Sequence, residues 1–324
     1  MTLPDATYRL EAISPRAFQH PADRAATAAL KQVPYLDAVV RRLIELGYER
    51  AMRQAMLGSA VRLGQEQLPR IWVLEREVFH VLDLEDVPDL YLTQFPIANA
   101  LTFGSGWPVI VLNSELVRLL DAEGLRVVVA HEAAHVLSDH VLYQTALIII
   151  MQLSARLPVV AGLPLLAIRS ALLEWSRAAE LSCDRAAALV TRDPIAVCRA
   201  LMTIAGGEAV DELNLDAFMK QGLEYDEKGS GLERLTRLFM QLNITHPMPV
   251  RRTHQLLDWV RAGEYDRIKD GSYIRRGQEP PLSEEAGAAQ DHYAERVRDA
   301  FKDVGDSLGD VGDQLGGWLG RQSK

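Results

Sequence analysis

Residues 125–140 read LRVVVAHEAAHVLSDH and contain the pattern H-E-x-x-H. Apolar residues recur here at spacings of three and four, which predicts a helix, and Asp121 is expected to cap its N-terminus. Residues four apart lie one turn apart on the same face of a helix, so His131 and His135 can bind one metal ion. Glu132 then lies where its carboxylate can reach water bound to that ion. The pattern predicts a zinc site; the alternative is a helix that carries two histidines by chance.

A downstream segment offers a third ligand. Residues 175–188 read WSRAAELSCDRAAA and are predicted to form a helix on which Glu180 and Asp184 lie one turn apart. A catalytic zinc usually has three protein ligands, and Glu180 completes a His-His-Glu set. Asp184 can accept a hydrogen bond from the distal nitrogen of a ligand histidine and fix its tautomer. The alternative is a solvated helix face, which the surrounding alanines disfavour because they predict burial.

The two segments together resemble the HtpX-like zinc metallopeptidases, which include the CAAX-prenyl endopeptidases. H-E-A-A-H followed by S-R-A-A-E-L-S-C-D-R carries the resemblance, which extends over roughly residues 90–257. It implies an α+β, mostly helical, zincin-like domain with one zinc ion per chain, held by His131, His135 and Glu180 and supported by Asp184. Cys183 departs from the family, which more often has alanine there.

Two accessory motifs extend the resemblance. Asn99-Ala100 precedes the active-site helix, and Thr245-His246-Pro247 follows it. Asn99 could hold a peptide that pairs with an edge strand at this point. In the resembled family, a His-Pro at the position of His246 lies near the metal, where the histidine could donate to the developing oxyanion. The alternatives are ordinary turn chemistry for Asn99 and an ordinary loop histidine for His246. The other histidines, including His20 and His140, are predicted to be structural.

The predicted function is a zinc metalloendopeptidase acting on peptides or unfolded proteins, with protein quality control as its setting. Zinc would polarise the scissile carbonyl and lower the pKa of its bound water towards about 7. Glu132 would take the water's proton and deliver it to the leaving amine. A second hypothesis is a zinc-dependent chaperone or adaptor that holds peptides without cleaving them, but such a site would not need Glu132. A metal-free helical scaffold leaves both ligand patterns unexplained.

Composition excludes some classes of partner and compartment. The chain has 324 residues, 48% of them hydrophobic, which is enough to bury a full core. Its net charge of −9 argues against a nucleic-acid partner. Two cysteines offer no disulfide framework, and the N-terminus lacks the pattern of a signal peptide. We therefore expect a cytoplasmic protein, with a possible place at the cytoplasmic face of the membrane.

A small sheet is predicted before the active-site helix. Residues 90–93 and 109–112 read as strands, and residues 103–108 form a turn between them, so an antiparallel pair is expected. An edge strand there could pair with an extended substrate. The metallopeptidase domain is assigned to residues 1–270, with an N-terminal helical part over 1–64 and a catalytic core over 88–257.

Residues 145–168 form the longest apolar stretch and allow two interpretations. The stretch is long enough to cross a bilayer, which takes about 20 apolar residues, but Arg156, Pro158 and Pro164 interrupt it. We predict two buried or interfacial helices that form a hairpin over the cleft and could make peripheral membrane contact. Membrane insertion is the alternative.

The composition changes from residue 271. Residues 271–290 are predicted to be a disordered linker, and 291–324 an acidic, Gly-rich, amphipathic tail with a heptad-like apolar stripe. The tail could dock on the apolar hairpin, pair with its copy in another subunit, or only aid solubility. The oligomeric state does not follow from the sequence.

Overall fold

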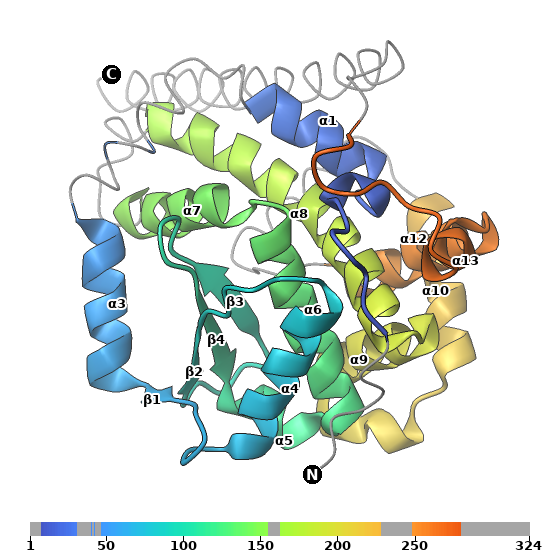
Figure 1. Cartoon of the computed structure of the whole chain (residues 1–324), viewed down its shortest axis with the longest axis horizontal. Helices are drawn as coiled ribbons and strands as arrows, with labels where there is room; N and C mark the ends of the chain where they lie inside the picture. Colours follow the sequence, from blue (N-terminus) through green and yellow to red (C-terminus); the bar gives the residue numbers. More distant parts are fainter. Residues whose placement is uncertain are drawn as a thin grey trace, which may run out of the picture.

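The described part of the chain is mostly helical and contains one four-stranded sheet, as the predicted α+β class requires (Figure 1). The structure is a computed structural model, and it describes residues 8–30, 40, 42, 47–154, 163–227 and 248–279. The helices are η1 (Pro15–Ala17), α1 (Pro21–Leu30), α3 (Tyr48–Ser59), α4 (Pro69–Val81), α5 (Ser114–Leu119), α6 (Ala122–Leu137), α7 (Val141–Ser154), α8 (Leu163–Thr191), α9 (Pro194–Gly206), η3 (Gly207–Glu212), α10 (Leu215–Glu227), α12 (Pro249–Arg261) and α13 (Glu264–Lys269). His246 and the tail over 291–324 lie outside the described residues.

The sheet is mixed, so the prediction of an antiparallel pair was wrong. Its strands are β1 (Val61–Arg62), β2 (Asp89–Thr93), β3 (Ala100–Phe103) and β4 (Val109–Asn113), in the order β1-β2-β4-β3. The two predicted strands, β2 and β4, are adjacent but parallel. The reason is β3, a short strand that the sequence analysis missed. The chain reverses into β3 and again into β4, so β4 runs in the same direction as β2.

The predicted turn before β4 is present and depends on glycine. Gly104 has φ of +97°, in the region that side chains avoid, and a Cβ there would lie 2.6 Å from the carbonyl oxygen of Trp107. The turn places β3 beside β4. Strand β3 is an edge strand of the sheet, next to α6.

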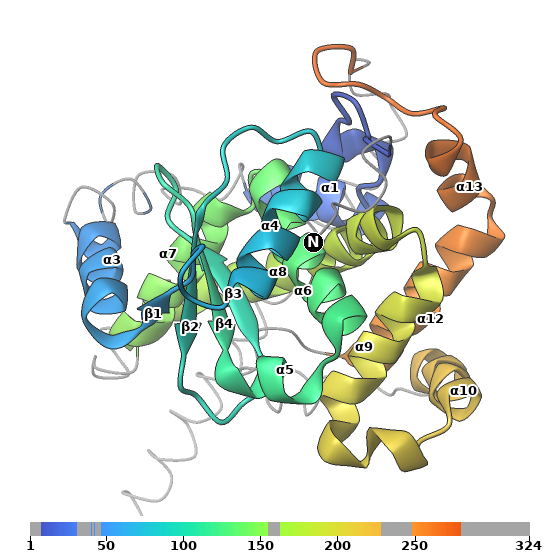
Figure 2. The same cartoon turned by 60° about the horizontal axis from the view of Figure 1, so that its bottom comes forward.

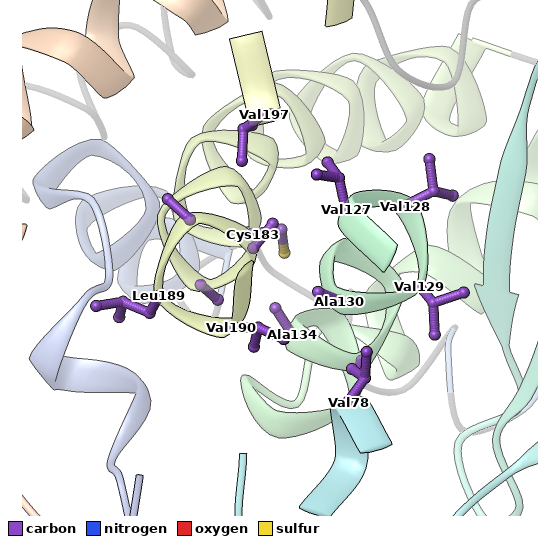
Figure 3. Packing of buried hydrophobic residues seen from close by; sticks show 14 of the residues in the cluster. Val78, Val127, Val128, Val129, Ala130, Ala134, Cys183, Leu189, Val190 and Val197 are labelled. Carbon is purple, nitrogen blue, oxygen red and sulfur yellow. The ribbon is translucent and has the colours of Figure 1, made fainter. Parts of the chain in front are cut away.

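Helix α6 is the central element and is buried on nearly all sides. The carboxylate of Asp121 caps it by accepting a hydrogen bond from Gly124 N at 2.7 Å, as predicted. Figure 3 shows Ala130 and Ala134 of α6 between Val190 of α8 and Val78 of α4. These small side chains let α6 and α8 approach closely, which brings the polar residues of the two helices together.

Helix α8 is one continuous helix from Leu163 to Thr191, so the end of the apolar stretch 145–168 and the predicted helix over 175–188 belong to the same element. Residues after Leu163 continue directly into the segment that carries Glu180, because helix-favouring residues follow Pro164 without interruption. No single helix in the described ranges is long and apolar enough to cross a membrane, although α6 and α7, bent by 101° at the break, pass the same test as a pair. Helix α7 packs on α8 and β3.

The N-terminal segment and residues 271–279 lie together on the catalytic part. Ser14 N donates to Ile274 O at 3.0 Å, and Arg276 N donates to Ala12 O. The described part of the predicted disordered linker is therefore held in place by backbone hydrogen bonds. Helix α1 packs on α8, and α9, α10, α12 and α13 lie on the side away from the sheet (Figures 1 and 2).

Candidate metal centre

The predicted ligand side chains meet between α6 and α8. Oε2 of Glu180 lies 3.3 Å from Nε2 of His131, and its Oε1 lies 3.4 Å from Nε2 of His135. All three side chains are buried. Two imidazole nitrogens and a carboxylate that converge in this way form a donor set suited to a zinc ion.

The partners of His131 come from α8 and α12. Its Nδ1 lies 3.0 Å from Oδ1 of Asp184, where the sequence analysis placed an acceptor. Arg252 donates to both oxygens of Asp184, at 2.7 and 2.6 Å, and contacts Oε2 of Glu180 at 3.0 Å. This buried arginine was not predicted, because nothing in the spacing of α12 links it to α8.

The partners of His135 come from other parts of the chain. Its Nδ1 lies 3.1 Å from Nδ1 of His140 and 3.0 Å from Nε2 of Gln144. Nε2 of His140 lies in turn 3.2 Å from Oδ2 of Asp23, in helix α1. The sequence analysis predicted that His140 is structural, and it did not consider Asp23.

Glu132 has a partner from the sheet. Its Oε2 accepts a hydrogen bond of 2.6 Å from the hydroxyl of Thr102 on β3. The carboxylate is buried, and Glu132 lines a cavity. The hydrogen bond from the edge strand sets the orientation of this carboxylate. Strand β3 reads Ala-Leu-Thr-Phe, which is short and does not alternate between polar and apolar residues, so no pattern in the sequence pointed to Thr102.

Cys183 is a second candidate for the third ligand. Its sulfur and one nitrogen each of His131 and His135 lie within 4.8 Å of one another. The sulfur is also 3.8 Å from Nδ1 of His140. Burial, followed by the charge of Glu180, raises the pKa of the thiol well above its usual value. Glu180 fits the third position better, because its carboxylate oxygens face the Nε2 atoms of both histidines at 3.3 and 3.4 Å.

Electrostatics at the centre favour positive charge. Burial lowers the pKa of both histidines, but the Glu180 and Asp184 carboxylates outweigh it at His131 and raise its pKa to about 9. At His135 burial prevails, and the pKa is lowered to about 4. Burial alone would raise the pKa of Asp184, but the charge of Arg252 outweighs it and the pKa is lowered. Asp184 is therefore held ionised beside His131, and a buried ionised carboxylate favours a cation at the centre.

A cavity of about 590 Å³ opens beside His131 and Glu132. Its walls are mostly apolar and include Leu116, Val127, Val128, Ala200, Leu201 and Ile204. Phe95 and Ile97 also line it, with 52% and 57% of their surface exposed. Asn99 lines it at the start of β3, and its carbonyl oxygen accepts from Asn113 N at 3.0 Å.

The predicted hairpin does not cover this cavity. None of the described residues of α7 lines it. Instead, α7 packs behind the metal-site helix, where Gln144 reaches His135 and the hydroxyl of Thr145 accepts from Gly104 N at 2.8 Å. The prediction of a hairpin over the cleft was therefore wrong for the part of the chain described, because the apolar face of α7 is buried against α8.

Comparison with known proteins agrees with these features. Residues 73–260 match the model of peptidase family M48. A relative from Arabidopsis thaliana, plastoglobule-localized metallopeptidase 48, chloroplastic, is 36% identical over 256 residues, which cover 78% of this chain and 74% of the relative. No solved structure gives a significant match.

Proposed function

The chain belongs to peptidase family M48 and is a metallopeptidase, and we propose that it is a zinc-dependent endopeptidase acting on peptides or unfolded proteins. The observation that carries the proposal is the convergence of Glu180 on both Nε2 atoms of the H-E-x-x-H helix, at 3.3 and 3.4 Å. Glu132 lines the adjoining cavity, where a peptide can reach it.

In this proposal His131, His135 and Glu180 hold one zinc ion per chain. When bound, zinc supplies Lewis acidity that activates a water molecule and polarises the scissile carbonyl. Asp184 accepts a hydrogen bond from Nδ1 of His131, so the proton of this ring lies on Nδ1 and the lone pair of Nε2 faces the metal. Arg252 keeps Asp184 ionised and holds it in position.

Glu132 acts as the general base and then as the general acid. Its carboxylate takes a proton from the attacking water and later delivers that proton to the leaving amine. The hydroxyl of Thr102 donates to only one carboxylate oxygen, Oε2, and orients the group toward the cavity. We also propose that His246, outside the described residues, stabilises the oxyanion, as the family resemblance implies.

The cavity and the edge strand support binding of an extended peptide. Strand β3 ends the sheet beside α6, and such an edge can pair with a substrate backbone. Asn99 lies at the start of this strand, and we propose that it holds the peptide. The apolar walls favour substrates with an apolar side chain near the scissile bond. Unfolded proteins expose such side chains, which favours a role in protein quality control.

Peripheral contact with a membrane through residues 145–168 remains part of the proposal. The name of the Arabidopsis relative places that protein at plastoglobules. We expect this chain to leave a membrane fraction under high-salt or alkaline wash. Extraction by detergent alone would contradict peripheral contact.

The central test compares four variants of the full-length protein. Glu132→Gln should bind zinc as the wild type does but lose nearly all cleavage of an unfolded protein substrate, because it removes the base and keeps the ligands. His131→Ala and Glu180→Ala should lose zinc, as measured by metal analysis. Cys183→Ala should keep it.

The same set separates the alternatives. Full zinc content in Glu180→Ala together with loss in Cys183→Ala would show that the third ligand is Cys183. Peptide binding by the wild type without any cleavage would favour the chaperone or adaptor hypothesis. Cleavage by Glu132→Gln at the wild-type rate would contradict the proposed mechanism.

A further inference from the structure

We propose that Asp23 and His140 are positioning residues for metal binding: with His135 they form a chain of close polar contacts from helix α1 to the metal centre, which determines which ring nitrogen of His135 faces the ion. The inference rests on the proposed zinc site. It assigns a role to the N-terminal helix, which lies outside the residues matched by the family model, 73–260.

The distances define the chain. Nδ1 of His135 and Nδ1 of His140 are 3.1 Å apart, and Nε2 of His140 is 3.2 Å from Oδ2 of Asp23. All three side chains are buried. Ring nitrogens this close must share one proton, so one of them donates and the other accepts.

The carboxylate of Asp23 decides the direction of these bonds. An ionised carboxylate only accepts, so His140 must carry its proton on Nε2. The Nδ1 of a neutral His140 is then an acceptor, and His135 must carry its proton on Nδ1. The lone pair of His135 is thereby left on Nε2, the nitrogen that lies 3.4 Å from Oε1 of Glu180. Asp23 thus selects the metal-binding tautomer of His135 through an intermediate imidazole.

Asp23 is itself held by several donors. The hydroxyl of Ser182, on α8, donates to Oδ2 at 2.6 Å, and Gln19 Nε2 donates to the same oxygen at 3.1 Å. The hydroxyl of Thr27 donates to the other oxygen, Oδ1, at 3.2 Å. The ring of His140 also packs edge-on against Trp175, with centroids 5.5 Å apart. The carboxylate and the intermediate ring therefore have little freedom to turn away.

Gln144 reaches the same nitrogen and supplies a competing explanation. Its Nε2 is placed 3.0 Å from Nδ1 of His135, while its Oε1 is buried and has no hydrogen-bond partner among the described residues. Turning the amide by 180° would place that oxygen against Nδ1 as a second acceptor. As placed, the amide nitrogen only donates and would favour the opposite tautomer, with the proton on Nε2 of His135. The turned amide favours the same tautomer as the Asp23–His140 pair, so only substitution can separate the two contributions.

The test measures the zinc dissociation constant of the full-length protein by competition with a chelator. Asp23→Asn and His140→Phe should each bind zinc about 10 to 100 times more weakly than the wild type, as is typical when an outer hydrogen-bond partner of a ligand histidine is removed. Ala26→Gly is the matched control. It weakens helix α1, because glycine is less favourable than alanine in a helix interior, but it removes no polar group of the chain, so zinc affinity should stay at the wild-type value.

Nitrogen chemical shifts of the histidine rings supply a readout that a general loss of stability would not move. In the zinc-loaded wild type, His135 should carry its proton on Nδ1 and His140 on Nε2. The His140 assignment should change in Asp23→Asn, because an amide can donate as well as accept. If Asp23→Asn does not fold, His140→Phe and the wild-type shifts decide the question.

The outcomes separate this inference from the proposed function. Wild-type zinc affinity in both Asp23→Asn and His140→Phe would overturn the inference alone, and a loss only in Gln144→Leu would assign the role to Gln144. Equal weakening of zinc binding in Ala26→Gly would show that the effect is a general loss of packing of α1 and would also overturn the inference. A wild-type protein that binds no zinc would overturn both proposals.

Discussion

The two histidines of α6 are supported by opposite parts of the molecule. His131 contacts a carboxylate directly, Asp184, which is paired with Arg252 from α12. His135 reaches a carboxylate only through a second imidazole, His140, and that carboxylate, Asp23, comes from α1 near the N-terminus. The metal centre therefore depends on residues outside α6 and α8, the two helices that carry its ligands. Both ends of the described chain must pack on α8 before each imidazole has its partner.

A third buried carboxyl shows why these partners matter. Glu75 on α4 is 1% exposed, and one of its oxygens, Oε1, has no hydrogen-bond partner in the described ranges. Burial raises its pKa to about 8. Burial acts in the same direction on Asp23, but the charge and hydrogen bond of His140, with those of Ser182 and Gln19, outweigh it and lower the pKa to about 2. Burial alone would make a carboxyl neutral, so Asp23 and Asp184 stay ionised because of their partners.

The largest effect is expected from breaking the support of His131. Arg252→Gln would leave Asp184 and Glu180 buried without their cation, and loss of one partner from a buried ion pair typically costs about 3–5 kcal/mol. We expect the free energy of unfolding to fall by that amount in chemical denaturation followed by circular dichroism.

Arg261→Gln is the control for this substitution. Arg261 lies on the same helix but is exposed and pairs only with Asp258, a contact expected to contribute less than about 1 kcal/mol. Equal losses in the two variants would mean that the buried network contributes no more than a surface pair.

A smaller effect is expected from Asp184→Asn, and it sharpens the comparison between direct and relayed support. The variant keeps the shape of the side chain but removes the charge that accepts from His131, so the zinc dissociation constant should rise about 10- to 100-fold. Because Asp184 contacts a ligand histidine directly, Asp184→Asn should weaken zinc binding more than Asp23→Asn does in the same chelator competition. A larger loss for Asp23→Asn would reverse the order proposed for the two histidines.

The smallest effect is expected at Glu132, which lies between the two histidines in sequence and accepts a hydrogen bond from Thr102. Thr102→Val should lower kcat about tenfold, because a hydrogen bond to a charged group contributes about 1.5–3 kcal/mol and part of that loss is recovered by water. Zinc content should not change. Thr102→Ser keeps the hydroxyl and should restore most of the rate in a steady-state peptide assay. Equal rates in Thr102→Val and wild type would show that Glu132 needs no orientation from β3.

The sequence predicted the inner part of the centre better than its surroundings. The spacing of His131 and His135 indicated one helix face, and the spacing of Glu180 and Asp184 indicated a second, because helical geometry depends only on near neighbours in the chain. Asp121 was also recognised as the cap of α6. The direction of β4 relative to β2 was predicted wrongly, since pairing depends on the intervening strand β3 and not on either strand's own pattern.

The local pattern of residues was thus enough to predict the composition and geometry of the donor set: two helices, each presenting polar side chains one turn apart. The groups that orient these side chains became known only from the packing of distant segments. Thr102 is 30 residues from Glu132, Arg252 is 68 from Asp184, and Ser182 is 159 from Asp23. No periodicity connects residues at such separations. They meet because the apolar faces of α1, α6, α8 and α12 are buried together, and the polar groups enclosed by that packing must find partners among themselves.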